Sequence, residues 1–331
     1  MAKNKALKLK DIFGLEKKPE KGLLAFEWIV VGYTLLTLLV IFFTYTKLPN
    51  AQAMIVGRVR IIAIIGALWF VYRLAPCPLT RFARVGTQLA LLAWWYPDTY
   101  ELNRILPNLD HIFAQADQNF FGFQPALLFS QWMPWPWFSE LMDLGYASYF
   151  PMIAVVVLYY FFYRYRDFNT MAFVVLGSFF IFYVIFIFLP VTGPQYYYLA
   201  IGPDNVLNAN FEAVGDYFYR HTERIASPGW QKGIFYHLVE DAHQAGERPT
   251  AAFPSSHIGI TVVLLILAWR AQSRRQLLFW CLLPFAVLMF FATVYIQAHY
   301  VVDSVAGLFA GILFYNLDVD QYVAFLEKGL E

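Results

Sequence analysis

The sequence predicts an all-α integral membrane protein with about eight transmembrane helices. The first reason is composition, because 60% of the 331 residues are hydrophobic and only 14% are charged, against about a quarter charged in a typical soluble domain. The second is the recurrence of apolar runs close to the ~20 residues that a spanning helix needs. The third is an uneven distribution of basic residues between alternate connections, which is typical of a multi-pass protein.

The expected spans are 23–44, 59–76, 83–97, 143–163, 170–190, 256–270, 276–296 and 300–316. The first follows a lysine-rich stretch and exceeds the apolar core of a cleaved signal peptide, so we expect it to be retained. The second carries Arg60 and Arg73 near its ends, where long side chains can reach the membrane interface. The third is short, and the Pro and Gly of LPVTGPQYYY end the fifth.

Basic residues predict the orientation of these helices. The N-terminal lysines and the arginines after the second, fourth and sixth spans fall on one side, which should be cytoplasmic together with both termini. Two longer segments, about 98–142 and 191–255, should lie in the periplasm or an equivalent lumen. The expected organisation is a basic N-terminus at 1–22, two N-terminal helices at 23–82, a main membrane domain at 83–316 and a cytoplasmic tail at 317–331.

Two short stretches place histidines at the ends of apolar helices. FPSSHIG contains His257, and IQAHYVVDSVAG contains His299 and Asp303. Each histidine begins an expected helix, and an even number of crossings separates them, so both should lie on the outer side at one membrane depth. Asp303 follows His299 at i+4 and shares its helix face. Ionisable residues within membrane spans usually serve a function.

Two histidines and an aspartate suffice for phosphoryl transfer through a covalent intermediate. One imidazole attacks phosphorus, and the carboxylate orients it and stabilises its positive charge. The second imidazole protonates the leaving oxygen and then activates the acceptor. A metal site made of the same three residues is the alternative chemistry, but no fourth ligand is evident. We therefore expect neither a metal nor a cofactor.

The quoted residues resemble the type 2 phosphatidic acid phosphatase superfamily, which includes lipid phosphatases, inositol phosphorylceramide and sphingomyelin synthases, and vanadium haloperoxidases. Its Pro-Ser-Gly-His motif corresponds to Pro254, Ser255, Ser256 and His257, with Ser256 in place of Gly. Its Ser-Arg, five residues, His, three residues, Asp motif ends on His299 and Asp303. The resemblance implies a six-helix catalytic core, with His299 as nucleophile, Asp303 as its orienting carboxylate and His257 as acid and base.

The phosphate-binding cations of the phosphatases have no counterpart at the expected positions. Ala292 and Thr293 stand where Ser-Arg would be, and GPQYYY stands near the end of the fifth span instead of Lys with Arg-Pro. Arginine is preferred where a phosphate dianion is held, so its absence favours a phosphodiester. The inositol phosphorylceramide and sphingomyelin synthases also lack these cations, and we therefore favour their branch. Candidate substrate-binding residues are Ser255, Ser256, Arg248 and Gln195.

The sequence thus predicts a lipid phosphotransferase that acts at the outer leaflet on a phospholipid and a ceramide or diacylglycerol, with no role for nucleic acid. A lipid phosphate monoester phosphatase and a non-enzymatic transporter are the alternatives. Transporters often show repeats or broken helices near the midplane, and neither is evident in the sequence.

Several aromatic and histidine residues are expected to have no catalytic role. The dense Trp and Phe of segment 98–142 suit a membrane interface. Tyr196 to Tyr198 favour interfacial anchoring, and Tyr146 and Tyr149 should pack between helices. Histidines of the second long segment should be solvated, namely His221, His237 and His243.

Overall fold

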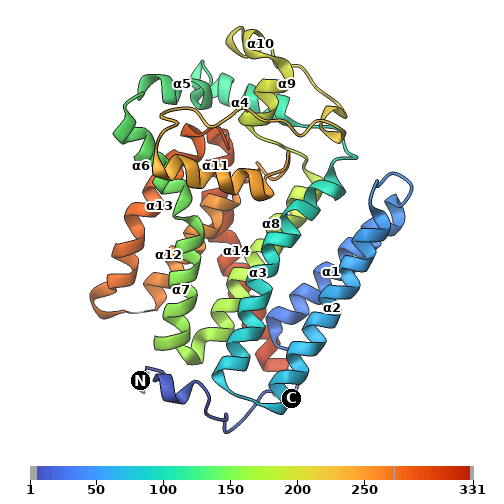
Figure 1. The fold of residues 1–331 in the computed structure, drawn as a ribbon, viewed down its shortest axis with the longest axis vertical. Helices are drawn as coiled ribbons and strands as arrows, with labels where there is room; N and C mark the ends of the chain where they lie inside the picture. Colours follow the sequence, from blue (N-terminus) through green and yellow to red (C-terminus); the bar gives the residue numbers. More distant parts are fainter. Residues whose placement is uncertain (1–5, 272, 329–331) are drawn as a thin grey trace.

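The computed structural model describes residues 6–271 and 273–328, and all regular secondary structure in these residues is helical. Long helices run along one axis of the molecule, while shorter helices and loops cover one end of the bundle (Figure 1). The first and last described residues lie at the other end (Figure 1). The predicted all-α class is therefore confirmed.

The long helices that form the bundle are α1 (Ala25–Thr44), α2 (Ala51–Leu74), α3 (Pro78–Asn103), α6 (Pro136–Ala147), α7 (Tyr149–Tyr163), α8 (Phe168–Phe188), α12 (Ser256–Arg270), α13 (Leu277–Tyr295) and α14 (Val301–Lys328). The helices that cover one end, called the loop end below, are α4 (Asp110–Phe121), α5 (Pro125–Trp132), α9 (Pro194–Ile201), α10 (Pro203–Leu207) and α11 (Ile234–Gly246). Single 3₁₀ turns lie at Leu9–Asp11, Tyr165–Asp167, Tyr217–Tyr219 and Arg274–Gln276.

Every predicted span coincides with a helix, but not all of these helices are long and apolar enough to cross a bilayer. Among the described residues five qualify, in α1, α2, α8, α13 and α14, and α6 with α7 makes a sixth if the bent pair is one span. The apolar helix α12 has only 15 residues, and α3 is less apolar. The count of eight therefore stays a prediction. Several bounds differ: α2 begins at Ala51, before residue 59, α3 extends beyond both ends of 83–97, α6 begins before 143, and α14 continues past 316 to Lys328.

The fourth predicted span is bent rather than straight. It begins at Pro136, breaks at Ser148 and changes direction by 44° between α6 and α7. Pro151 explains the break, because proline lacks a backbone N–H and its ring collides with the carbonyl one turn earlier. The Ser148 hydroxyl donates a hydrogen bond to the Gly145 carbonyl at 2.6 Å and stabilises the bend.

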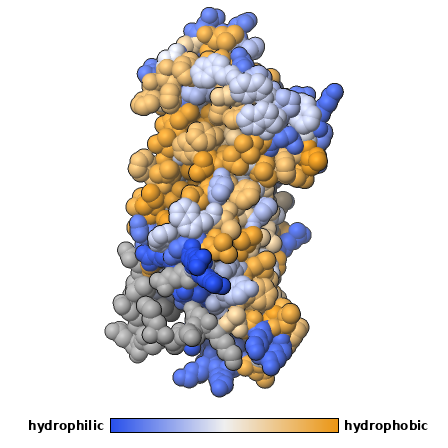
Figure 2. All heavy atoms as spheres, turned by 90° about the vertical axis from the view of Figure 1, so that its left-hand side faces the viewer, coloured by the Kyte–Doolittle hydropathy of each residue, from blue (hydrophilic) through white to orange (hydrophobic). Residues whose placement is uncertain are grey.

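Helix α8 forms the centre of the bundle. Of its apolar window, 78% is buried, and it packs against α1, α3, α7, α12 and α14. A helix that is apolar on all sides is expected inside a bundle rather than at its surface. On the outside, one face of the molecule shows a predominantly hydrophobic middle with hydrophilic residues towards both ends (Figure 2). This distribution suits a protein embedded in a bilayer.

Glycines bring α12 and α14 into backbone contact. A Cβ added at Gly307 would lie 2.4 Å from the carbonyl oxygen of Ser255, and one at Gly311 would lie 2.4 Å from that of Gly259. Small residues four apart allow such close approach of membrane helices. The contact places the start of α12, with His257, directly beside the start of α14, with Asp303.

Candidate active site

A narrow pocket at the loop end contains both predicted histidines. Its walls come from α3, α6, the start of α12, and the segments that precede α9, α12 and α14. The lining residues are Tyr96, Tyr146, Thr192, Glu247, Thr250, Ala251, Ala252, Ser256, His257, Ala298 and His299. The topology therefore brings together residues that are more than 200 positions apart in the sequence, as the even number of crossings predicts for the two histidines.

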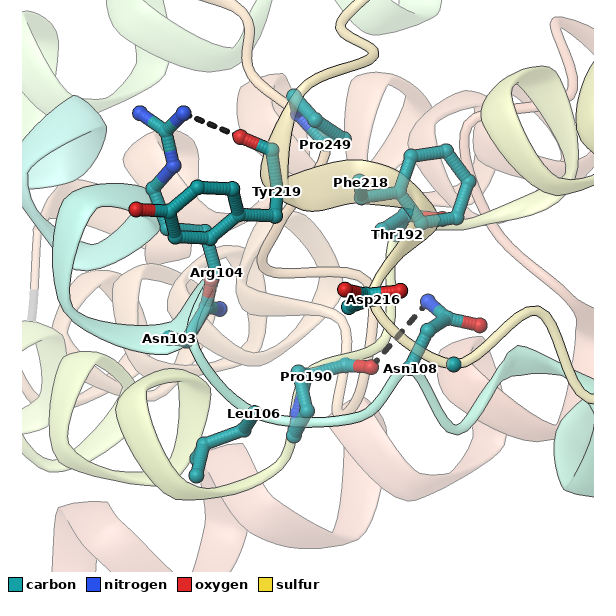
Figure 3. A pocket seen from close by; sticks show the side chains of 11 residues that line it. Asn103, Arg104, Leu106, Asn108, Pro190, Thr192, Asp216, Phe218, Tyr219 and Pro249 are labelled. Carbon is teal, nitrogen blue, oxygen red and sulfur yellow. Dashed lines mark hydrogen bonds between the residues drawn. The ribbon is translucent and has the colours of Figure 1, made fainter. Parts of the chain in front are cut away.

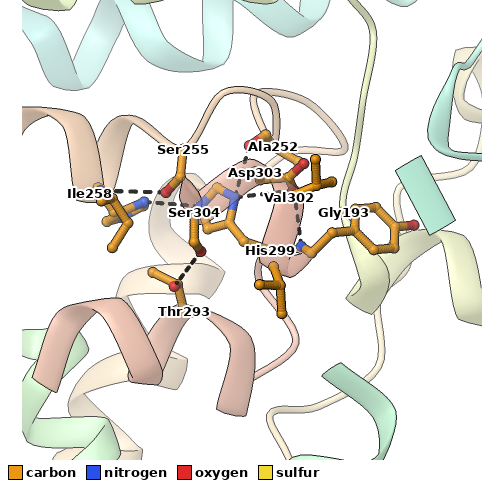
Figure 4. A network of polar contacts seen from close by, with 12 residues as sticks. Gly193, Ala252, Ser255, Ile258, Thr293, His299, Val302, Asp303 and Ser304 are labelled. Atoms are coloured by element: carbon orange, nitrogen blue, oxygen red, sulfur yellow. Dashed lines mark hydrogen bonds and ion pairs between the residues drawn. The ribbon is translucent and has the colours of Figure 1, made fainter. Parts of the chain in front are cut away.

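The tautomer of His299 follows from its contacts. Its Nδ1 lies 2.8 Å from the carbonyl oxygen of Ala252 (Figure 4). Because a carbonyl oxygen can only accept, Nδ1 carries the proton in the neutral ring and Nε2 holds a free lone pair. Nε2 lies 3.5 Å from Nδ1 of His257. The unprotonated nitrogen thus faces the second imidazole across the pocket, as a nucleophile would.

His257 lies between two tyrosine rings. Its ring centroid is 4.7 Å from that of Tyr146, nearly parallel, and 4.5 Å from that of Tyr149. Both tyrosines are buried and pack between helices as predicted, because they lie on α6 and α7 and contact the ring of His257 on α12. The imidazole is half-buried, and the two rings restrict its rotation. Its position relative to His299 is therefore held by packing rather than by hydrogen bonds to a carboxylate.

Asp303 is close to His299 but is not its nearest hydrogen-bond partner. Its Oδ2 lies 3.6 Å from Nδ1 of His299 and accepts a hydrogen bond from the Tyr300 amide at 3.0 Å. The side chain is fully buried, and its Oδ1 has no partner among the described residues. The carboxylate can therefore stabilise positive charge on His299, while Ala252 holds the tautomer.

Two aspartates of α4 hold the segment around His299 in place, and sequence analysis missed both. Asp117 accepts hydrogen bonds from the amides of Val301 and Val302 at 2.8 and 3.0 Å, so it caps α14. Asp110 accepts from the Tyr300 hydroxyl at 3.1 Å and from the amide of Gly193 at 2.8 Å. The only signal in the sequence is their spacing, about two turns on one helix face.

A close contact joins the segment before α9 to the residue before His299. Gly193 has a φ of 91°, and a Cβ there would lie 2.4 Å from the carbonyl oxygen of Ala298. Only glycine combines this backbone conformation with such an approach. The Gly of GPQYYY therefore allows the segment before α9 to pack directly against the residue that precedes His299.

The two predicted serines have different places. The Ser255 hydroxyl accepts a hydrogen bond from the Ile258 amide at 3.4 Å and caps α12, and the Ser255 amide donates to the Asp303 carbonyl at 3.0 Å (Figure 4). Ser255 is fully buried outside the pocket lining, whereas Ser256 lines the pocket. Ser255 thus shapes the site, and Ser256 is the serine that a substrate can reach.

The other two candidate binding residues do not line this pocket. Gln195 is buried, and its backbone N–H donates a hydrogen bond to the Gln297 carbonyl. Its side-chain Oε1 has no partner among the described residues. Arg248 is exposed, and its guanidinium donates to the Glu247 carbonyl at 2.7 Å. Tyr196 to Tyr198 are all buried, so the prediction that they anchor the chain at the interface was wrong.

His243 is buried, although sequence analysis predicted that it is solvated with His221 and His237. The latter two are exposed. His243 lies on the face of α11 that packs on α6, and its ring centroid is 5.5 Å from that of Tyr146. The amphipathic pattern of α11 turns this face inward.

The positions of the missing phosphatase cations are filled by buried neutral residues. Ala292 and Thr293 are fully buried, and the Thr293 hydroxyl lies 3.1 Å from that of Ser304 (Figure 4). A neighbouring pocket shares Thr192 and contains Arg104 (Figure 3). The Arg104 guanidinium is already engaged by the Tyr219 carbonyl and by Glu101. In the part of the chain that the structure describes, no three His, Cys, Asp or Glu side chains are grouped as metal ligands.

The pH dependence of activity should reflect the environment of His299. Burial lowers the pKa of its imidazole from 6.5 to about 4, although the Ala252 carbonyl opposes the shift. The neutral form of the His299 imidazole therefore persists as the pH falls through 6.5 and is lost only as the pH approaches 4. We expect the acid limb of kcat/KM to have its midpoint between about 4 and 5, measured on purified protein from pH 4 to 8. A midpoint near 6.5 would contradict a desolvated nucleophile.

Comparison with known proteins identifies the superfamily of the chain. No curated protein and no solved structure matches the chain. A model described as the PAP2 superfamily matches residues 112–317, which are more than half of the 331 residues and include His257, His299 and Asp303. The chain therefore belongs to the PAP2 superfamily.

Proposed function

We propose that the protein transfers a phosphorylated head group from a donor phospholipid to the hydroxyl of a second lipid, such as ceramide or diacylglycerol. PAP2 superfamily membership indicates phosphatase or phosphotransferase chemistry on lipid phosphates. The observation that carries the proposal is the pair of imidazoles in one pocket, with Nε2 of His299 unprotonated and 3.5 Å from His257. This is the arrangement that a covalent phosphohistidine route requires.

The first half-reaction moves the head group onto the protein. The lone pair of His299 Nε2 attacks phosphorus, and the bond between phosphorus and the diacylglycerol oxygen breaks. This oxygen leaves with the electron pair and takes a proton from protonated His257, so that neutral diacylglycerol departs. The positive charge that develops on the His299 ring is stabilised by Asp303 at 3.6 Å.

The second half-reaction returns both histidines to their starting states. The acceptor hydroxyl gives its proton to His257 and attacks phosphorus, and the electrons of the nitrogen–phosphorus bond return to Nε2. With a lipid hydroxyl as acceptor the product is a new phospholipid, and with water it is the free phosphorylated head group. The balance between the two depends on which hydroxyl reaches the pocket.

The charge of the pocket favours a diester over a monoester. None of the described residues that line it is Lys or Arg, and Ala292 and Thr293 are neutral and buried. A phosphate diester carries one negative charge fewer than a fully ionised monoester, so it loses less in a site without cations. The start of α12, where Ser256 and His257 line the pocket, supplies a partial positive charge instead.

Aromatic residues on the neighbouring helices suit lipid substrates. The exposed rings lie at the loop end in the segment from α4 to the start of α6, namely Phe120, Trp132, Trp135 and Trp137. Exposed Trp of this kind is typical of the head-group region of a bilayer. Such a position would bring the pocket to the depth of lipid phosphates and hydroxyls.

A mixed-micelle assay tests the proposal. Purified protein is given a phospholipid donor labelled in its head group, with ceramide or diacylglycerol as acceptor, and phosphatidic acid in a parallel reaction. We expect labelled transfer product, with hydrolysis as a slow side reaction. Rapid phosphate release from phosphatidic acid without any transfer product would instead identify a monoester phosphatase.

The side of the membrane that carries the pocket is tested by cysteine labelling. In a background lacking Cys77 and Cys281, Gln244→Cys on α11 should react with an impermeant maleimide in intact spheroplasts, and Arg274→Cys should react only after lysis. Both positions are exposed in the structure, whereas position 243 is buried and would report poorly. Labelling of Arg274→Cys alone in intact cells would place the pocket in the cytoplasm.

A further inference from the structure

Glu247 places a carboxylate in the pocket that holds the two histidines. It follows the last residue of α11 and lines the pocket with His257 and His299. Its Oε1 accepts a hydrogen bond from the Tyr96 hydroxyl at 2.8 Å. No described residue donates a hydrogen bond to its Oε2, which leaves this oxygen available to a ligand.

Neither Arg224 nor Arg248 forms an ion pair with this carboxylate in the structure. Arg224 binds Glu240 through both of its terminal nitrogens, at 3.2 and 2.7 Å. The guanidinium of Arg248 donates to the backbone carbonyl of Glu247 and is otherwise exposed. Among the described residues Glu247 forms no ion pair. It is therefore a negative charge beside the place where a phosphate must bind.

A carboxylate beside a bound phosphate is unfavourable unless another part of the substrate interacts with it. The carboxylate repels a phosphate monoester, because the monoester dianion brings two negative charges close to it. It attracts a head group that carries hydrogen-bond donors, such as an ammonium or a set of hydroxyls, because charged acceptors form the stronger hydrogen bonds. The same residue can thus exclude one class of lipid phosphate and select another.

We propose that Glu247 binds the hydrogen-bond donors of the head group whose phosphorus His299 attacks. The proposal rests on the head-group transfer proposed above and narrows its substrate class. The donor lipid is a phosphodiester with an ammonium or hydroxyl group close to the phosphate. In this arrangement the phosphate faces His299 and the start of α12, and the head group extends towards Glu247 and Tyr96.

The test compares donor lipids that differ only in the head group. Release of diacylglycerol is measured in mixed micelles with phosphatidylmethanol, phosphatidylethanolamine, phosphatidylinositol and phosphatidic acid. Phosphatidylmethanol is a diester without donors, while the ethanolamine and inositol lipids separate ammonium from hydroxyl recognition. For the wild type, kcat/KM should be at least about tenfold higher for one of these two than for phosphatidylmethanol.

Two variants test whether the preference for a donor-bearing head group depends on the Glu247 carboxylate. Glu247→Gln keeps an acceptor for Tyr96 but removes the charge, so the preference over phosphatidylmethanol should fall about tenfold. Activity with phosphatidic acid should rise relative to the diesters. Tyr96→Phe removes the hydroxyl that binds Oε1 and retains the charge. The preference should therefore fall less in this variant than in Glu247→Gln.

The outcomes separate the two proposals. If the wild type releases diacylglycerol from every diester at an equal rate, or if Glu247→Gln slows all donors equally, head-group transfer stands and the role of Glu247 is wrong. If the wild type releases diacylglycerol from no diester, both proposals are wrong.

Discussion

Replacement of His299 by alanine should abolish turnover, with a loss of at least about 10⁴-fold in kcat, as expected when a covalent nucleophile is removed. In the proposed reaction His257 serves as the acid that protonates the leaving group, so it is not expected to replace His299. The fold should survive, although the Ala252 carbonyl loses its partner at a cost of about 1–3 kcal/mol. Activity is measured with the labelled donor, and stability by thermal unfolding in detergent.

His237→Ala serves as the matched control, because this exposed histidine of α11 lies outside the pocket and its loss should leave turnover unchanged. Quenching in alkaline detergent with a phosphorus-labelled donor adds a direct observation. The wild type should carry label that is lost in acid and stable in base, as a phosphohistidine is, and His299→Ala should carry none. A variant that still turns over, or still carries the label, would rule out His299 as the nucleophile.

The second large effect is expected for Asp303→Asn. In serine-protease triads this change costs about 10⁴-fold, because the histidine adopts the wrong tautomer. Here the Ala252 carbonyl holds Nδ1–H at 2.8 Å, so the tautomer should be retained and only the negative charge beside the developing cation is lost. We therefore expect a smaller loss, of about 10² to 10³-fold in kcat, as when one electrostatic contact to a transition state is removed.

The control for this variant is on the same helix. Asp318 of α14 is also buried and accepts a hydrogen bond from Ser178 at 2.8 Å, far from the pocket. Asp318→Asn should change stability slightly and leave kcat unchanged. Asp303→Asn with kcat within about threefold of the wild type would show that Ala252 alone orients the nucleophile.

The convergence of His257, His299 and Asp303 could be predicted from the sequence because it depends on local rules. The i+4 spacing sets the face of one helix, and the even number of crossings sets the side of the membrane. The α6–α7 bend was not predicted, although Pro151 was its signal. The contacts of Tyr146 and Tyr149 with His257 were not predicted, because they depend on how α6 and α7 pack beside α12.

The positions of Asp117 and Glu247 at the site could not be predicted, because they depend on contacts between residues far apart in the sequence. Asp117 caps α14 from a position 184 residues earlier, and no local pattern indicates which amides it meets. Glu247 belongs to the polar segment before α12, where sequence analysis singled out its neighbour Arg248 as a phosphate ligand. The backbone at the end of α11 decides which of the two side chains points into the pocket, and this depends on how α11 packs on α6.

The pocket includes a residue, Tyr96, that lies outside the segment matched by the superfamily model. It lies on α3, outside the matched residues 112–317, and yet it forms one wall of the pocket and holds Glu247. The matched segment contains His257 and His299, the proposed reacting groups, while a helix that precedes it forms part of the pocket wall. A chimera that carries residues 112–317 behind the N-terminal helices of another member should therefore keep the chemistry and change its choice of lipid. New specificities could in this way arise by exchange of the N-terminal helices, without any change to the histidines.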